Sequence, residues 1–363
     1  MISRRRILTL AVSMAVTLAA ATSWAQAISG VSGSPAHGGQ VTISGSAFGT
    51  KPTAAPVIWD NFETGAFNRI TPWSSTGNPA GLLTVAASGA NARHPNSLYN
   101  TTANFPGTDG WATLSGGSDS PSWYCQYWFK LDNDWNWGTS AVQGTPNSNL
   151  ANVKIFRMWS TANISENFAV AAHGWENSVI VTTENIAAQP ADYTGGGYLT
   201  DWTKGVWHLF QFEFKDSGQG VADGVFRWWI DGKLEFESTN WITRSASANY
   251  KRVYGLGFFN SNGDASTDAN HFYMDDAYID NSWARVELGN NASYEACTHR
   301  EIQVPVSWSA SAVTVTVNQG SFNTGDAAYV FVTSPTGVKS PGYRVTIGGT
   351  PTSAPGAPGK PTF

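Results

Sequence analysis

Residues 205–237 read GVWHLFQFEFKDSGQGVADGVFRWWIDGKLEFE, and this stretch decides the fold. Within it, residues 208–215 and 225–230 alternate between two kinds of side chain at every second position, which is typical of β-strands with one buried face. Asp231 and Gly232 form a common two-residue hairpin turn, so a third strand should follow them. We therefore predict a three-stranded antiparallel meander.

The alternation divides the side chains of this meander between two faces. One face is apolar and is predicted to be core: Phe210, Phe212, Phe214, Phe226, Trp228 and Ile230. The other face carries Gln211, Glu213, Lys215, Arg227 and Trp229. Because an aromatic ring among polar groups can stack on a sugar ring, this second face is a candidate groove.

The meander resembles that of a known family. Trp207-His208, the alternating strand and the closing run Trp229-Ile230-Asp231-Gly232-Lys233 are similar to concanavalin A-like lectin/glucanase jelly rolls, particularly those of heparin-lyase-like polysaccharide lyases. The resemblance implies an antiparallel jelly-roll sandwich that holds polysaccharide on its concave face.

The composition agrees with an all-β protein. The 363 residues include 37 Gly and 17 Trp, and only 13% are charged. These proportions suit strands and loops better than helices. The length allows one large β domain or two domains, with a sizeable core in either case.

Residues 1–25 are predicted to be an export signal. Arg4-Arg5-Arg6 precede the apolar residues 7–21, and Ser23-Trp24-Ala25 supply small residues at a cleavage position. We expect an exported protein, periplasmic or extracellular, that uses either a Sec or a twin-arginine signal. The apolar run is too short to span a membrane. Loss of its three arginines would change the net charge from −5 to −8, which disfavours binding to nucleic acid or to anionic membranes.

A second pattern is divided between the two ends of the chain. Residues 41–49, VTISGSAFG, resemble the first half of an IPT/TIG immunoglobulin-like domain, and residues 313–317 and 342–348 resemble its second half. This resemblance implies one small β-sandwich interrupted by the jelly roll. The alternative is two unrelated β segments packed on the jelly roll. The expected boundaries are 1–25 for the signal, 26–56 and 290–349 for the halves of the small immunoglobulin-like sandwich, 57–289 for the jelly roll and 350–363 for a flexible tail.

The two ends of the insert resemble the first and last strands of jelly-roll carbohydrate-binding modules. They read IWDNFETG at residues 58–65 and FYMDDAYID at residues 272–280. In those modules the two strands meet and often hold a structural calcium ion. The resemblance implies a Ca²⁺ site built from carboxylate oxygens at Asp60, Glu63, Asp275 and Asp276. Alternatively, these acids cap turns or are solvated.

The chain has two cysteines, Cys125 and Cys297. In an oxidising compartment they are candidates for a disulfide bond. The alternative is two buried, unpaired thiols.

Three functions on a glycan can be compared: hydrolysis, β-elimination and binding without a reaction. Hydrolysis needs two carboxylates across the sugar bond, and the E-x-D-x-x-E pattern of jelly-roll glucanases is absent. β-Elimination on a uronic acid needs a cation or an amide at the substrate carboxylate and a base near C5. The candidates for those catalytic roles are Arg227, Gln211, Arg157 and His173. The candidates for substrate binding are Trp229, Glu213, Lys215, Trp128, Lys130 and Trp175.

We predict an exported protein that binds polysaccharide on the concave face of a jelly roll. A polysaccharide lyase is the enzymatic alternative, and a surface or adhesion scaffold is the second alternative. Within residues 152–159, strict alternation places Arg157 and Trp159 on the face opposite Lys154. No cofactor other than calcium is implied, and the sequence leaves the oligomeric state open.

Overall fold

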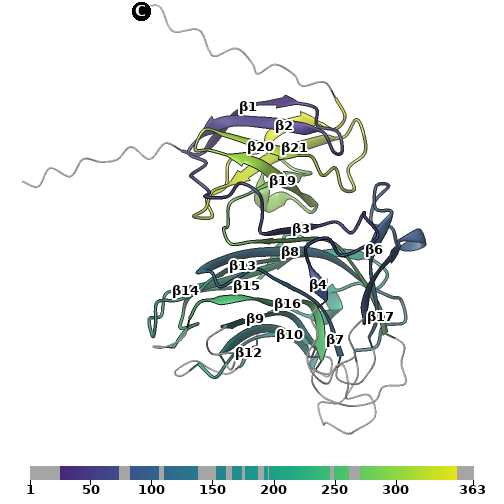
Figure 1. The fold of residues 1–363 in the computed structure, drawn as a ribbon, viewed down its shortest axis with the longest axis vertical. Coiled ribbons are helices and arrows are strands. Elements are labelled where there is room, and N and C mark those ends of the chain that lie inside the picture. The colour runs from purple at the N-terminus through teal and green to yellow at the C-terminus, as the bar shows by residue number, and fades with distance from the viewer. Residues whose placement is uncertain are drawn as a thin grey trace, which may run out of the picture.

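The computed structural model describes residues 25–72, 82–105, 110–137, 153–160, 166–173, 176–186, 192–194, 196–245, 249–260 and 270–349. The predicted export signal (apart from Ala25), Trp175 and the predicted tail lie outside these residues. The described chain is all-β, with three 3₁₀ turns at Gly89–Asn91, Leu199–Asp201 and Tyr294–Ala296. Figure 1 shows a small β-sandwich lying on a larger, bowed one.

The larger sandwich consists of two antiparallel sheets, here called sheet I and sheet II. Sheet I has the order β15 (Lys233–Trp241), β14 (Gly224–Ile230), β13 (Trp207–Lys215), β8 (Ser122–Leu131), β17 (Asn270–Asp280), β6 (Tyr99–Phe105) and β5 (Leu83–Ala87), with β3 (Ile58–Asp60) also paired to β17. Sheet II has the order β12 (Asp192–Thr194), β11 (Ser178–Glu184), β10 (Asn167–His173), β9 (Val153–Ser160), β16 (Lys251–Asn260), β7 (Gly110–Gly116) and β4 (Thr71–Pro72). The antiparallel sandwich predicted for the fold class is confirmed.

The predicted meander is present in sheet I as β13, β14 and β15. Phe212 lies opposite Trp228 in the β13–β14 register, and the turn after β14 has positive φ at Asp231 (49°) and Gly232 (83°), as a two-residue hairpin requires. The predicted apolar face is buried between the two sheets, where the ring of Phe212 stacks on that of Phe156 from β9 at a centroid distance of 4.4 Å. The alternation therefore predicted the core face correctly.

The small sandwich joins the two ends of the chain. Its strands have the order β1 (Ala27–Gly33), β2 (Gln40–Ser46), β20 (Ala312–Thr316), β19 (Arg300–Trp308), β18 (Arg285–Gly289), β21 (Ala327–Thr333) and β22 (Tyr343–Thr346). β2 pairs with β20, which is about 270 residues away in sequence, and their apolar side chains share one core. β18 belongs to this sandwich, so the expected end of the jelly roll at residue 289 is too late.

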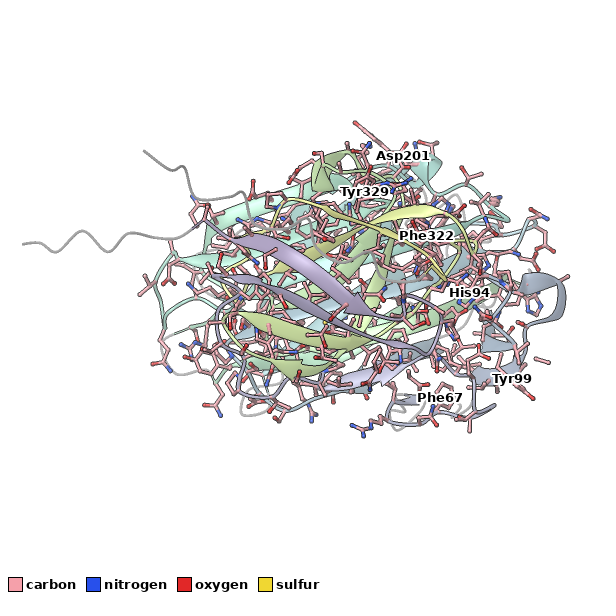
Figure 2. All side chains as sticks on the ribbon, turned by 90° about the horizontal axis from the view of Figure 1, so that it is seen from above. Phe67, His94, Tyr99, Asp201, Phe322 and Tyr329 are labelled. Atoms are coloured by element: carbon pink, nitrogen blue, oxygen red, sulfur yellow. The ribbon has the colours of Figure 1, made fainter. Side chains whose placement is uncertain are left out.

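The two sandwiches meet through charged side chains that are buried between them. Seen from above, strands of the small sandwich lie over the sheets beneath (Figure 2). Arg285 of β18 donates hydrogen bonds to Glu213 Oε1 of β13 at 3.0 Å and to Glu287 Oε2 at 2.8 Å. Its guanidinium group also lies 4.0 Å above the ring of Tyr124 from β8. The outer face of sheet I is therefore an internal boundary over much of its area.

The two cysteines are not bonded to each other, so of the two alternatives the structure has the two buried, unpaired thiols and not the disulfide. Cys125 lies in the core between sheets I and II, and Cys297 lies in a separate cluster of the small sandwich. Burial raises the pKa of both thiols, and that of Cys125 is well above its usual range. In the described part of the chain, no helix has the length and apolar character needed to cross a membrane.

The first prediction concerns the buried Arg285. Replacing it in Arg285→Leu leaves Glu213 and Glu287 buried without that counter-charge, so we expect a loss of about 3–5 kcal/mol in the free energy of unfolding. Arg227→Leu is the matched control. It also removes an arginine bound to Glu213, but its side chain is 25% exposed, and we expect a loss of at most about 1 kcal/mol. Urea unfolding measures both, and equal losses would contradict the central role of Arg285.

The second prediction concerns the thiols. A chromogenic disulfide reagent should react with neither cysteine in the native protein and with both after denaturation, because the two side chains are buried. A reducing agent should leave the melting temperature unchanged. If denatured, unreduced protein contains no free thiol, the two residues are paired after all.

Candidate functional site

The four residues predicted to be catalytic lie on two opposite faces of the jelly roll. Gln211 and Arg227 are on the outer face of sheet I, beside the small sandwich. Arg157 and His173 are on the outer face of sheet II, on the far side of the shared core. These four residues therefore cannot form one active site, and the single groove expected from the sequence is wrong.

Gln211 is part of the contact between the two sandwiches. It is 1% exposed, and its Nε2 donates hydrogen bonds to the Tyr124 hydroxyl at 2.7 Å and to Glu287 Oε1 at 3.0 Å. Arg300 of β19 donates to its Oε1. Because all of these partners are buried, Gln211 has a structural role and cannot touch a substrate.

The residues predicted to bind substrate on sheet I have different environments. Trp128 is 6% exposed because the Arg93 guanidinium group covers its ring at 4.6 Å, so its prediction as a stacking platform is wrong. Lys130 donates to Asn91 Oδ1 at 2.9 Å, and Lys215 is exposed at the end of β13. Glu213 and Trp229 line a cleft beside the small sandwich.

Lys154 and Arg157 both lie on the outer face of sheet II, although the sequence predicted that they lie on opposite faces. Ile155 and Phe156 are consecutive in β9, yet both lie in the core. The β9–β10 register shifts there, since Phe156 pairs with Val170 while Lys154 pairs with Ala171. This bulge places Lys154 on the same face as Arg157, which corrects the strict alternation predicted for this strand.

Arg157 is held in place by several groups. Its Nη2 donates to Asn167 Oδ1 at 3.0 Å and to Glu184 Oε2 at 2.8 Å, and its guanidinium group lies 4.4 Å from the centre of the Trp159 ring. Its neighbours across the strands are Ala169 and Gly255, which leave space for the large side chain. Burial lowers the pKa of Arg157, and Glu184 opposes that shift.

Two further residues extend this group across to β16. The ring of Trp159 contacts that of Tyr254 edge-on at 4.3 Å, and the guanidinium group of Arg252 lies 4.9 Å from the Tyr254 ring. Trp159, Tyr254 and Arg252 are half-buried and therefore partly accessible. We call Arg157, Trp159, Tyr254 and Arg252 the cation–aromatic row. The alternation of Arg252, Val253 and Tyr254 is the sequence signal that could have identified its second half.

His173 lies at the end of β10 on the same outer face. It is half-buried, and its Nδ1 is 3.5 Å from Glu176 Oε2. Figure 1 shows the strands bowed, with the outer face of sheet II on the inner side of the bow and away from the small sandwich. The sequence placed the polysaccharide groove on the polar face of the meander, but that face is the outer face of sheet I, beside the small sandwich. The concave face is instead the outer face of sheet II.

The four residues predicted to bind calcium have protein partners instead. Asp275 accepts a hydrogen bond from the Ser97 hydroxyl at 2.6 Å. Asp60 accepts hydrogen bonds from the backbone of Phe62 and Asn68. Asp276 binds the Arg93 cation, which would repel a metal ion. Glu63 accepts from the Leu98 backbone. Among the described residues no group of three or more His, Cys, Asp or Glu side chains could hold a metal. The structure therefore gives the calcium site no support, and the site stays a prediction.

No family model and no curated protein matches the chain. Among solved structures, it is similar to an endo-β-1,4-glucuronan lyase from the fungus Trichoderma reesei, with 12% identity and a TM-score of 0.44 over 62% of this chain and 95% of that chain. It is also similar to a marine alginate lyase from Aplysia kurodai, with 10% identity and a TM-score of 0.39 over 55% of this chain and 86% of that chain. At these scores the likeness carries no argument about activity.

Proposed function

We propose that the protein is exported and binds an acidic polysaccharide on the outer face of sheet II. The observation that supports this is the cation–aromatic row, in which arginines flank two neighbouring rings: Arg157, Trp159, Tyr254 and Arg252. Rings of this kind stack on sugars, and arginine can bind a carboxylate through two parallel hydrogen bonds.

The members of the row contribute in different ways. Arg252 is half-buried, and it makes no ion pair with a carboxylate within the described residues. It is therefore the cation best suited to meet a sugar carboxylate. The side chain of Arg157 is only 7% exposed, so it positions Trp159 and adds positive charge beneath the rings. Lys154 lies on the same face and adds a second buried cation.

The size of the face suits a polymer. The five strands from β11 to β7 are neighbours in sheet II. At about 4.8 Å between strands they span roughly 20 Å. This is long enough for several sugar units, so binding can be shared among subsites.

A lyase is the second candidate, because the phenol of Tyr254 lies in the same row as two arginines. In that reaction a base removes the C5 proton of a uronate unit. The electron pair forms a C4=C5 double bond, and the glycosidic oxygen leaves from C4 and takes up a proton. Arg252 would neutralise the carboxylate at C5, and Tyr254 would supply the base or the acid.

The third prediction tests binding. Arg252→Ala should reduce retention in affinity gels that contain alginate, glucuronan, heparin or pectate by about tenfold, since the loss of one carboxylate contact is worth roughly 1.4 kcal/mol. Retention in neutral hydroxyethylcellulose should be weak for every form of the protein. Arg244→Ala is the matched control, because Arg244 also covers a tyrosine ring, that of Tyr250, at 4.0 Å. Equal retention of wild type and Arg252→Ala in all four acidic gels would rule out this face.

The fourth prediction separates binding from cleavage. For a protein that only binds, the ultraviolet absorbance of unsaturated uronate products should not appear when wild type is incubated with any of these four polymers. If the absorbance does rise and is lost in Tyr254→Phe while gel retention persists, the lyase replaces the binder. Arg244→Ala again serves as the control.

A further inference from the structure

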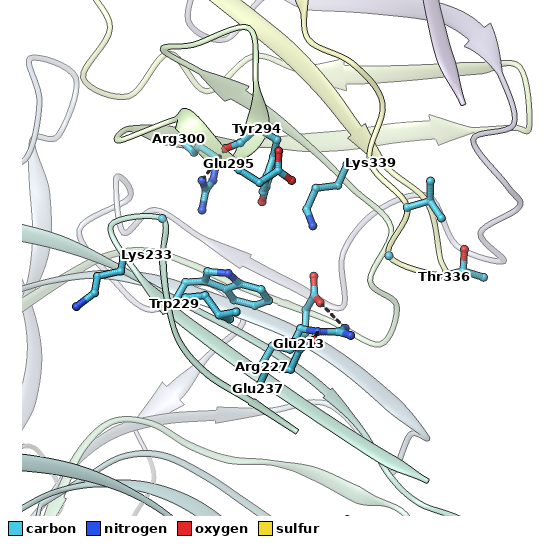
Figure 3. Close-up of a pocket in the computed structure, with 14 residues that line it drawn as sticks. Glu213, Arg227, Trp229, Lys233, Glu237, Tyr294, Glu295, Arg300, Thr336 and Lys339 are labelled. Atoms are coloured by element: carbon cyan, nitrogen blue, oxygen red, sulfur yellow. Dashed lines mark hydrogen bonds and ion pairs between the residues drawn. The ribbon is translucent and has the colours of Figure 1, made fainter. Parts of the chain in front are cut away.

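A cleft of about 620 Å³ opens between sheet I and the small sandwich (Figure 3). One wall comes from β13 and β14 and carries Glu213, Arg227 and Trp229. The other wall comes from the small sandwich and includes Tyr294 and Lys339. This cleft is on the opposite side of the jelly roll from the cation–aromatic row, so the proposed function does not use it.

Most of the cations around the cleft are already paired. Arg227 binds Glu237 Oε1 at 2.5 Å and Glu213 Oε2 at 3.5 Å. Lys233 binds Asp201 Oδ2 and Glu235 Oε1, each at 2.9 Å. Their charges are therefore largely neutralised within the protein.

Lys339 differs from these cations. Its ammonium group lies 4.7 Å from the centre of the Tyr294 ring, and within the described residues it makes no ion pair with a carboxylate. Figure 3 shows the side chain pointing from the small sandwich into the cleft. Burial, followed by the nearby Arg285, lowers its pKa, and the carboxylates of Glu213, Glu287 and Glu295 oppose that shift.

Trp229 faces Lys339 from the other wall. Its indole is half-buried and borders the cleft, and no ring or cation of the described residues stacks on it. The exposed carboxylates of Glu237 and Glu295 also line the cleft and can accept hydrogen bonds from hydroxyl groups. The cleft therefore combines a flat apolar surface, an unpaired positive charge and several hydroxyl acceptors.

We propose that this cleft is a second carbohydrate site that binds an acidic sugar residue. The pyranose ring stacks on Trp229, the carboxylate of the sugar pairs with Lys339, and the glutamates accept hydrogen bonds from its hydroxyl groups. The volume is within the usual range for a small-molecule site, which is roughly 300–1,000 Å³. Because the two walls belong to different sandwiches, the bound sugar bridges them.

The fifth prediction concerns the affinity of the cleft for sugars. Isothermal titration calorimetry measures it with a glucuronan trisaccharide as the acidic ligand and with cellotriose as the neutral comparison. Lys339→Gln should weaken binding of the acidic trisaccharide at this site by about tenfold and leave cellotriose binding unchanged. Trp229→Ala should weaken both, whereas Trp229→Phe, which keeps a ring, should restore most of the affinity. Lys233→Gln is the matched control and should bind like wild type, because Lys233 is already paired.

The two sites are separated by working in the Arg252→Ala background, in which the sheet II face is weakened. We expect binding of the trisaccharide to remain in that background and to weaken by about a further tenfold when Lys339→Gln is added. If Arg252→Ala alone removes all binding, the cleft is not a carbohydrate site. If Lys339→Gln and Trp229→Ala both bind like wild type, the proposal is also overturned. Melting temperatures equal to that of wild type show that the variants are folded.

Discussion

The guanidinium group of Arg285 is buried where three parts of the chain meet, and the arrangement of the two sandwiches depends on it. It joins Glu213 of the jelly roll to Glu287 of the small sandwich and lies against the ring of Tyr124. Because a buried charge without partners costs several kcal/mol, these groups are stable only when both sandwiches are in contact. The contact removes much of the outer face of sheet I from solvent and leaves sheet II as the open face of the jelly roll.

A second buried cluster fixes the orientation of the two sandwiches. Arg93 of the jelly roll binds Asp276 beside it and Glu301 of the small sandwich, the latter at 2.8 Å. Burial would raise the pKa of Glu301, but Arg93 and His299 together outweigh it and the pKa falls to about 2. Directional ion pairs specify one relative placement in a way that an apolar contact does not. Because the cleft between Trp229 and Lys339 has one wall from each sandwich, its shape depends on this placement.

Sequence periodicity predicted the structure within single stretches of chain and missed the contacts between residues that are far apart in the sequence. The meander, its turn at Asp231 and its core face follow from alternation within one stretch. The role of Gln211 could not be predicted in this way, because its partner Glu287 lies 76 residues away in sequence and in another sandwich. The bulge at Ile155 was missed for a different reason: one extra residue reverses the face of every residue before it. Lys154 and Arg157 therefore lie on the same face, whereas strict alternation predicts opposite faces for them.

Because the protein has a net negative charge, it can attract an acidic ligand only through cations that lie close to the bound ligand. The full chain carries a net charge of −5, so a polyanion is repelled at long range. At physiological ionic strength, charges are screened over about 8 Å, and only cations close to the ligand then matter. Arg252 beside Tyr254 and Lys339 beside Tyr294 satisfy that condition, since each lies against an aromatic ring and has no carboxylate partner within the described residues. Each ring also excludes water from one side of its cation, which strengthens the cation's attraction for a sugar carboxylate.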